Sequence, residues 1–159
     1  MILVILGTQK FQFNRLLKMI DDLLDEKTIK EEVIAQIGNS DYCPKNFSYV
    51  KFFSHEDFIK KINECDIVIT HGGVGSISNA LRFHKKTIVV PRNSKYNEHV
   101  DNHQYELTKK YSELGYILSA TDYEELKKCL NDISDFELKF KNNNKKSKVK
   151  EEILNFINN

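Results

Sequence analysis

The stretch DIVITHGGVGSISNALRF, residues 66–83, joins an apolar run, a cluster of glycines and an amphipathic segment. Residues 66–70 contain the β-branched run IVIT, which is typical of a buried strand. Glycines follow at once, and Ser76–Phe83 then has the apolar spacing of a helix. A strand, a glycine turn and a helix in this order are part of a βαβ unit, so the stretch predicts an α/β domain.

The same alternation of strands and helices extends to both sides of this stretch. Further strands are expected at residues 1–6, 32–37, 48–53, 87–90 and 116–118. Further helices are expected at residues 13–24, 54–63, 99–114 and 121–130. Continuous apolar strands such as MILVIL, residues 1–6, indicate a sheet that is covered on both sides. Because crossovers between parallel strands are right-handed, we predict a Rossmann-like parallel sheet with helices on both faces.

The composition excludes several classes of protein. The chain has 159 residues, of which 40% are hydrophobic and 30% charged, and its formal net charge is +1. This balance provides no overall field to attract nucleic acid. No stretch reaches the roughly 20 apolar residues of a membrane-spanning helix, and the apolar N-terminus lacks the basic flank of a signal peptide. Cys43, Cys65 and Cys129 are too scattered for a zinc motif and are expected to be reduced thiols of a cytoplasmic protein.

A change in composition near residue 135 divides the chain into a domain, residues 1–134, and a tail, residues 135–159. Lysine and asparagine dominate residues 139–150, which predicts a polar linker. The apolar residues that follow recur at helical spacing: Val149, Ile153, Phe156 and Ile157. A short amphipathic C-terminal helix is therefore expected, either packed on its own domain or docked on a partner.

The glycine cluster His71–Ser76 is a candidate phosphate site. In an open parallel sheet, ligands bind beyond the carboxyl ends of the strands, where this loop is expected. Glycines let the backbone approach a phosphate, and the helix that follows offers unpaired N–H groups. The loop lacks the lysine of a Walker A motif and differs from the Gly-x-Gly-x-x-Gly of dinucleotide folds. A tight turn without a ligand is the alternative.

Two more loops are expected at the same edge of the sheet. Gly7–Phe13 follows the first strand and can present backbone N–H groups and the Thr8 hydroxyl. Pro91–Gln104 (PRNSKYNEHVDNHQ) is crowded with hydrogen-bonding groups that suit the hydroxyls of a sugar. His99 and His103 would share a helical face, but the glutamate of a zincin motif is missing, so no metal site is predicted. Three converging loops predict one binding site.

Together these motifs resemble one known family, the C-terminal domain of glycosyltransferase family 28, over roughly residues 1–130. The residues that carry the resemblance are Gly7-Thr8-Gln9, Gln36-Ile37-Gly38, His71-Gly72-Gly73-Val74-Gly75-Ser76-Ile77, Val90-Pro91-Arg92 and the EHVDNHQ of residues 98–104. The similar branch holds the stand-alone catalytic subunit of the two-component transferase that adds the second N-acetylglucosamine to a dolichol-linked sugar. Bacterial relatives act in capsule and exopolysaccharide biosynthesis.

The resemblance implies the donor-binding half of a GT-B glycosyltransferase. The donor would be a UDP-sugar, and a hexose or N-acetylhexosamine would pass, with inversion and without metal or cofactor, to a polyprenyl-diphosphate-linked sugar. The acceptor half would be a separate membrane-anchored subunit. The chain would then be active only in that heteromer, in the cytoplasm at the inner face of the membrane. A non-catalytic, nucleotide-binding regulatory subunit is the alternative. Single-chain epimerases of this fold are much longer.

The resemblance also implies roles for particular residues. The loop His71–Ile77 would meet the diphosphate, His103 and Gln104 the sugar, and the segment around residues 36–40 the uracil. Asn79 stands where a murein-precursor relative has a glutamate that holds the ribose. A neutral hydrogen bond worth about 1 kcal/mol would then replace a charge-assisted one of about 1.5–3 kcal/mol.

The predicted substrate-binding residues lie in all three loops and the helix after the glycines. They are Gly7, Thr8, His71, Gly72, Gly73, Val74, Gly75, Ser76, Asn79, Arg92, Glu98, Asp101, His103 and Gln104. Arg92 or Lys95 is expected to stabilise the leaving diphosphate. No residue is a convincing catalytic base: His71 and His99 are weak candidates, and we expect the base on the partner. The substitution Gly73→Val is expected to abolish donor binding while leaving the fold intact.

Overall fold

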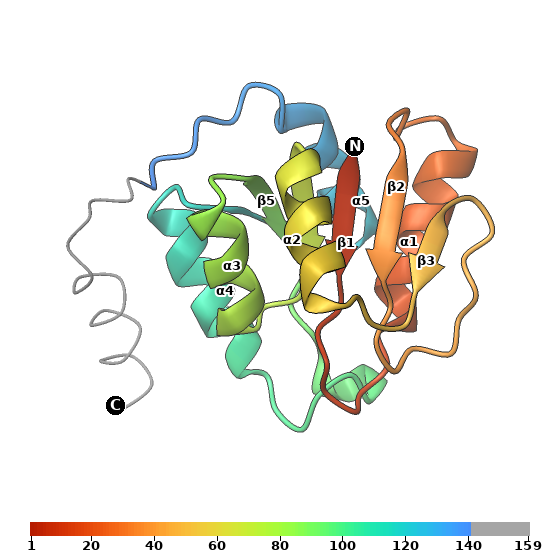
Figure 1. Ribbon diagram of the computed structural model, residues 1–159. Coiled ribbons are helices and arrows are strands. Elements are labelled where there is room, and N and C mark those ends of the chain that lie inside the picture. Colours follow the sequence, from red (N-terminus) through yellow and green to blue (C-terminus); the bar gives the residue numbers. More distant parts are fainter. Residues whose placement is uncertain (141–159) are drawn as a thin grey trace.

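Six parallel strands form the centre of the protein, which a computed structural model describes for residues 1–140 (Figure 1). The strands are β1 (Ile2–Ile5), β2 (Val33–Gln36), β3 (Ser48–Val50), β4 (Ile67–Thr70), β5 (Lys86–Val89) and β6 (Leu118–Ser119). Their order across the sheet is β3-β2-β1-β4-β5-β6, and every neighbouring pair is parallel. The predicted Rossmann-like sheet is confirmed.

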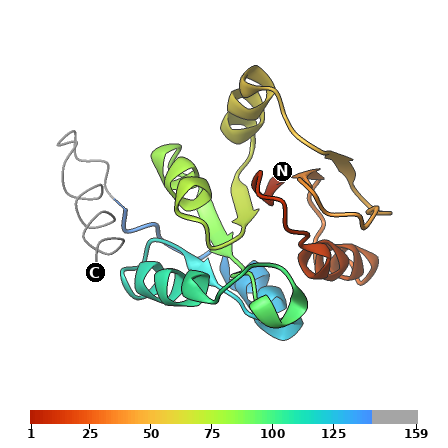
Figure 2. The same cartoon turned by 90° about the horizontal axis from the view of Figure 1, so that it is seen from below.

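Helices cover both faces of the sheet, as predicted (Figure 2). They are α1 (Asn14–Asp25), α2 (His55–Glu64), α3 (Val74–Arg82), α4 (His103–Glu113) and α5 (Tyr123–Asp132). Alternate side chains of β1 point to opposite faces of the sheet. Val4 belongs to the hydrophobic core under α1 and α5, whereas Leu3 belongs to the core under α2. Helix α4 shares an apolar cluster with α3 through Leu107 and Tyr111. Each face of the sheet thus packs against its helices through a separate hydrophobic core.

The order of the strands creates a crevice between β1 and β4. The two strands pair in the middle of the sheet, with Ile5 beside Thr70, so they end at the same level. The connection after β1 leads to one side of the sheet and the connection after β4 to the other, because the next strands lie on opposite sides. Such a switch point is where open α/β sheets bind ligands. It places Gly7 and His71 at the edge of the crevice.

One helix begins later than the sequence predicts. Residues 99–114 were expected to be helical, but α4 begins at His103. Side chains hold the preceding residues out of the helix: Asp101 accepts the backbone N–H of His103, and Asn102 accepts that of Ser94. His99 and His103 therefore do not share a helical face. This local competition between side chain and backbone is common for Asp and Asn.

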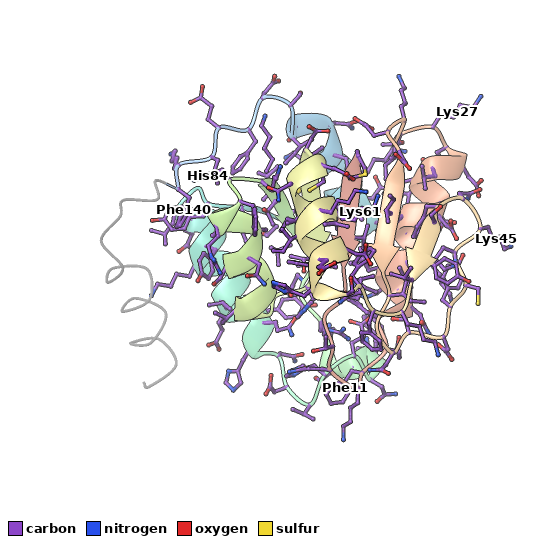
Figure 3. The ribbon with its side chains drawn as sticks, in the orientation of Figure 1. Phe11, Lys27, Lys45, Lys61, His84 and Phe140 are labelled. Atoms are coloured by element: carbon purple, nitrogen blue, oxygen red, sulfur yellow. The ribbon has the colours of Figure 1, made fainter. Side chains whose placement is uncertain are left out.

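The start of the expected tail packs on the domain. Phe136 lies against the core under α1 and α5, and Phe140 is buried against α3 and α4, with His84 beside it (Figure 3). The backbone N–H of Lys139 donates to Gly115 O. The division at residue 134 stays a prediction, and the expected C-terminal helix lies outside the described residues.

The helices of residues 1–140 are all too short or too polar to cross a membrane. Cys43, Cys65 and Cys129 are free thiols. Burial raises the pKa of Cys65 and of Cys129 to about 11, so both stay protonated at neutral pH.

Candidate functional site

A cavity of about 610 Å³ lies at the carboxyl edge of the sheet, at the switch point between β1 and β4. Three segments after strands and two strand ends supply its walls. The lining residues are Ile5, Gly7, Thr8, Gln9, Gln36, Phe53, Ser54, His55, Phe58, His71, Gly73, Val74, Gly75, Ser76 and Asn79. Eight of the fourteen predicted substrate-binding residues are among them: Gly7, Thr8, His71, Gly73, Val74, Gly75, Ser76 and Asn79.

The first turn of α3 points unpaired donors at this cavity. Gly73 is the N-cap of the helix, and its N–H donates to His71 Nδ1 at 3.0 Å. The N–H of Ser76 donates to Gly73 O. Within residues 1–140 the N–H groups of Val74 and Gly75 have no acceptor, and both residues line the cavity. Two free donors at the positive end of a helix dipole form a site for an anion.

His71 is buried behind these donors and uses both ring nitrogens. Nδ1 accepts from Gly73, and Nε2 lies 3.0 Å from Ser76 Oγ. Burial first, and then electrostatic interactions with Arg92 and His99, lower the pKa of His71 to about 3, and a hydrogen bond with the Gln104 side chain opposes this shift. The ring is therefore neutral at physiological pH and has no free lone pair, so His71 does not fit the part of a catalytic base.

The glycines around His71 differ in which atoms a Cβ added at each position would contact. Gly7 has a left-handed backbone, φ +75°, and a Cβ there would lie 2.6 Å from His71 Nε2. A Cβ on Gly73 would overlap His71 Cε1. A Cβ on Gly75 would meet no protein atom within 4 Å. The substitution Gly73→Val would displace the His71 ring, so it does not test the ligand alone, and the expectation that the fold stays intact remains a prediction. Gly75 is the position that tests the ligand alone.

The buried neutral state of His71 predicts that acid destabilises the protein. The unfolded chain takes up a proton on this residue near pH 6.5, its ordinary pKa, whereas the folded chain does so only near pH 3. The unfolding free energy should therefore fall as the pH drops from about 6.5 towards 3. Urea unfolding at several pH values checks this, and the His71→Asn variant should show a shallower decline. Equal declines in the two proteins would contradict it.

The loop Pro91–Gln104 does not line the cavity, although it was expected to. Arg92 is 1% exposed, and its guanidinium donates to four backbone carbonyls, those of Leu6, Phe11, Gln12 and Glu98. Burial lowers the pKa of Arg92 to about 10, which leaves it charged at neutral pH. Because Arg92 is buried and is absent from the cavity lining, it does not fit the expected role of binding the diphosphate.

A second arginine completes this network. Glu98 is fully buried and receives two hydrogen bonds from Arg15, from Nε and Nη2, each at 2.9 Å. It also accepts the backbone N–H of Asn93. Arg15 lies on α1, so this paired carboxylate ties the loop after β5 to the loop and helix after β1. Glu98 supports the site rather than lining it.

The other expected sugar-binding residues also lie outside the cavity lining. Gln104 Oε1 accepts from the backbone N–H groups of Gly72 and Arg92, so it joins the glycine loop to the loop after β5. A Cβ on Gly72 would collide with Gln104 rather than with a ligand. Asp101 pairs with His99, and His103 is exposed at the start of α4. Residues 1–140 hold no cluster of three His, Cys, Asp or Glu that could bind a metal ion.

Sequence reasoning missed one wall of the cavity. Phe53, Ser54, His55 and Phe58 come from the connection between β3 and α2 and from the first turns of α2. The signal was available in the helix expected at residues 54–63, because its first residue, Ser54, caps α2 through a hydroxyl that accepts the N–H of Asp57. Gln36 fixes this wall: its Oε1 accepts from the N–H of Phe53. The order of the strands, which brings the segment after β3 to the cavity, could not be predicted from the sequence.

Comparisons with known proteins agree on one family. The model of the glycosyltransferase family 28 C-terminal domain matches residues 1–157. The UDP-N-acetylglucosamine transferase subunit ALG13 of Debaryomyces hansenii is 33% identical over 137 residues, which are 80% of this chain and 64% of that protein. The ALG13 of Candida glabrata is 44% identical over 55 residues, which are 35% of this chain and 26% of that protein. The matches thus cover less than two thirds of these relatives.

Solved structures share the fold. The glycotransferase of kitacinnamycin has a TM-score of 0.58 and 18% identity, and the match covers 84% of this chain and 34% of that one. The solution structure of ALG13 has a TM-score of 0.56 and 21% identity, and the match covers 86% of each chain. The fold is that of a GT-B glycosyltransferase domain.

Proposed function

We propose that this chain, because it belongs to the glycosyltransferase family 28 C-terminal domain family, binds a nucleotide sugar in the cavity between β1 and β4. One observation carries the proposal: the free N–H groups of Val74 and Gly75 and the Ser76 hydroxyl converge at the start of α3. They suit a diphosphate, whose charge the helix dipole favours. The volume of about 610 Å³ is in the range of small-molecule sites.

The residues that line the cavity support an orientation for the nucleotide. With the diphosphate on the first turn of α3, Asn79 lies one turn further along the same helix. Its amide has no hydrogen bond within the described chain and is available to a ribose hydroxyl. Phe53 and Phe58 form the aromatic part of the lining and suit a base, which has a flat π face. Gln36 lines the same side, where the resemblance puts the uracil.

The proposed donor is UDP-sugar. The curated relatives are named as UDP-N-acetylglucosamine transferase subunits, so UDP-N-acetylglucosamine is the first donor to test. The proposed acceptor is a polyprenyl-diphosphate-linked sugar, of the kind used for dolichol-linked glycans or for capsule and exopolysaccharide. A membrane-anchored subunit would hold that acceptor and keep this chain at the cytoplasmic face. We propose that neither a metal nor another cofactor takes part.

In the proposed reaction, a hydroxyl oxygen of the acceptor attacks the anomeric carbon from the face opposite UDP. The bond from that carbon to the diphosphate oxygen breaks, so the configuration inverts and UDP leaves with the electron pair. Val74, Gly75 and Ser76 stabilise the negative charge that grows on the diphosphate. The hydroxyl proton passes to a base, which we place on the partner because both nitrogens of His71 are engaged.

The isolated chain is therefore expected to bind UDP but to transfer sugar poorly. Calorimetric titration with UDP, with FMN as the non-cognate control, measures the first property. A transfer assay with and without the partner subunit measures the second. Rapid transfer by the chain alone would contradict the two-subunit proposal, and failure to bind UDP would contradict the site. If the heteromer transfers sugar equally well after this cavity is blocked, the chain is a regulatory subunit.

A further inference from the structure

The Ser76 hydroxyl occupies an unusual position between a buried ring and the cavity. Ser76 lies in the first turn of α3, and Oγ contacts His71 Nε2 at 3.0 Å. Within residues 1–140 this is the only hydrogen bond of that hydroxyl. Ser76 also lines the cavity. The direction of the hydrogen bond therefore decides whether Ser76 offers the cavity a hydrogen or a lone pair.

The backbone settles that direction. The Gly73 N–H points at His71 Nδ1, at 3.0 Å, so Nδ1 is an acceptor and carries no proton. A neutral imidazole has one N–H, which is then on Nε2. Nε2 donates to Ser76 Oγ, which uses a lone pair of the hydroxyl and leaves its hydrogen free. A proton on Nδ1 would face the hydrogen of Gly73, so the same geometry disfavours the cationic ring.

We propose that His71 is a positioning residue, which fixes the Ser76 hydroxyl as a donor to an anionic oxygen in the cavity without touching that anion itself. The inference rests on the proposed function only for the identity of the anion, a diphosphate. In this role the His71 ring stays neutral: it neither accepts a proton from the acceptor hydroxyl nor binds the anion as a cation. The ring accepts the N–H of Gly73 on one nitrogen and donates to the Ser76 hydroxyl with the other, so the backbone at Gly73 fixes the orientation of the hydroxyl. The absence of a side chain at Gly7 and Gly73 leaves room for the ring on both sides.

The first test is spectroscopic and begins with the protein free of ligand. In ¹⁵N NMR of the full chain, the His71 ring should carry its proton on Nε2 and not on Nδ1. The ring should not titrate between pH 8 and 5, because its pKa is about 3. Addition of UDP should leave both properties unchanged. A proton on Nδ1, or a cationic ring in the UDP complex, would overturn the proposal.

The second test separates action through Ser76 from direct contact. Asn Oδ1 can accept the N–H two residues ahead, so His71→Asn keeps the bond to Gly73 and removes only the reach to Ser76. Ser76→Ala should weaken UDP binding about 10- to 100-fold, the value of a hydrogen bond to a charged group. His71→Asn should weaken it about three- to tenfold, because the hydroxyl then samples several rotamers.

The double variant decides the question. If His71 acts through Ser76, His71→Asn has no further effect on UDP affinity once Ser76 is alanine. Effects that add in the double variant would show direct contact of His71 with the ligand and would overturn the proposal. Thermal unfolding of each variant checks the fold, and His71→Gln, whose amide can reach Ser76, should bind UDP better than His71→Ala. Absence of UDP binding by the unaltered chain would refute the proposed function, whereas the ring spectrum would still test the role of His71.

Discussion

Substitution of Gly75 by alanine is expected to stabilise the free protein and, at the same time, to weaken UDP binding at least about tenfold. Gly75 is the second residue of α3, and in a helix alanine is favoured over glycine by about 0.5–1 kcal/mol. A Cβ there meets no protein atom within 4 Å, yet the residue lines the cavity. The methyl group would therefore occupy space that only a ligand needs. A steric loss of one diphosphate hydrogen bond of about 1.5 kcal/mol already gives the tenfold effect.

A general disturbance of the fold would lower both stability and UDP affinity, whereas Gly75→Ala is expected to raise the stability and lower the affinity. Thermal unfolding without UDP and calorimetric titration with UDP measure the two quantities on one preparation. Ser78→Ala is the matched control: it lies on the same helix outside the cavity lining, so it should raise helix stability slightly and leave UDP affinity unchanged. If Gly75→Ala binds UDP as tightly as the unaltered chain, the diphosphate does not lie on the first turn of α3.

The glycine loop was predictable because its chemistry is local. A strand, three glycines within four residues and the start of a helix are contiguous in the sequence, and the structure keeps them contiguous at the cavity. Val74 and Gly75 present their N–H groups for the same local reason, since every helix leaves its first donors unpaired. Asn79, which the resemblance implied, lies one turn beyond Gly75 on the same helix and also lines the cavity. Local sequence thus predicted most of one wall of the site.

The loop after β5 was interpreted less accurately because its contacts are distant in sequence. An arginine in a polar loop is exposed by default. Arg92 is instead buried because the carbonyls of Leu6, Phe11 and Gln12, about 80 residues earlier, gather around its guanidinium. Gln104 also looked suited to a sugar but accepts from two backbone N–H groups. Polar composition alone does not reveal whether such groups face a ligand or one another.

The wall from β3 and α2 was missed for a topological reason. Phe53 and Phe58 reach the cavity because β3 lies beside β2, on the side of the sheet to which the chain turns after β1. The sequence predicts that the strands are parallel but not their order. With the order known, the aromatic residues after β3 become the part of the site that suits a nucleotide base.

Substitution of Arg92 by methionine is expected to lower the unfolding free energy by about 3–5 kcal/mol, the cost of removing one member of a buried charged network. Methionine has a similar volume but no donors, so four backbone carbonyls lose their hydrogen bonds. The guanidinium also lies over the Phe13 ring, with 4.9 Å from Cζ to the ring centre, and this contact is lost as well. For a chain of this size the midpoint of thermal unfolding should fall by roughly 10 °C.

The same substitution at an exposed arginine provides the control. Arg82, in the last turn of α3, is exposed, so Arg82→Met should change the unfolding free energy by no more than about 0.5 kcal/mol. Arg92→Lys keeps the charge but cannot reach four carbonyls at once, so its stability should fall between those of the unaltered chain and Arg92→Met. If Arg92→Met unfolds at the original temperature but loses UDP affinity, Arg92 contacts the donor directly. Loss of stability shared by Arg92→Met and absent from Arg82→Met would instead establish that Arg92 holds the loops after β1 and β5 together, and so shapes the cavity from behind.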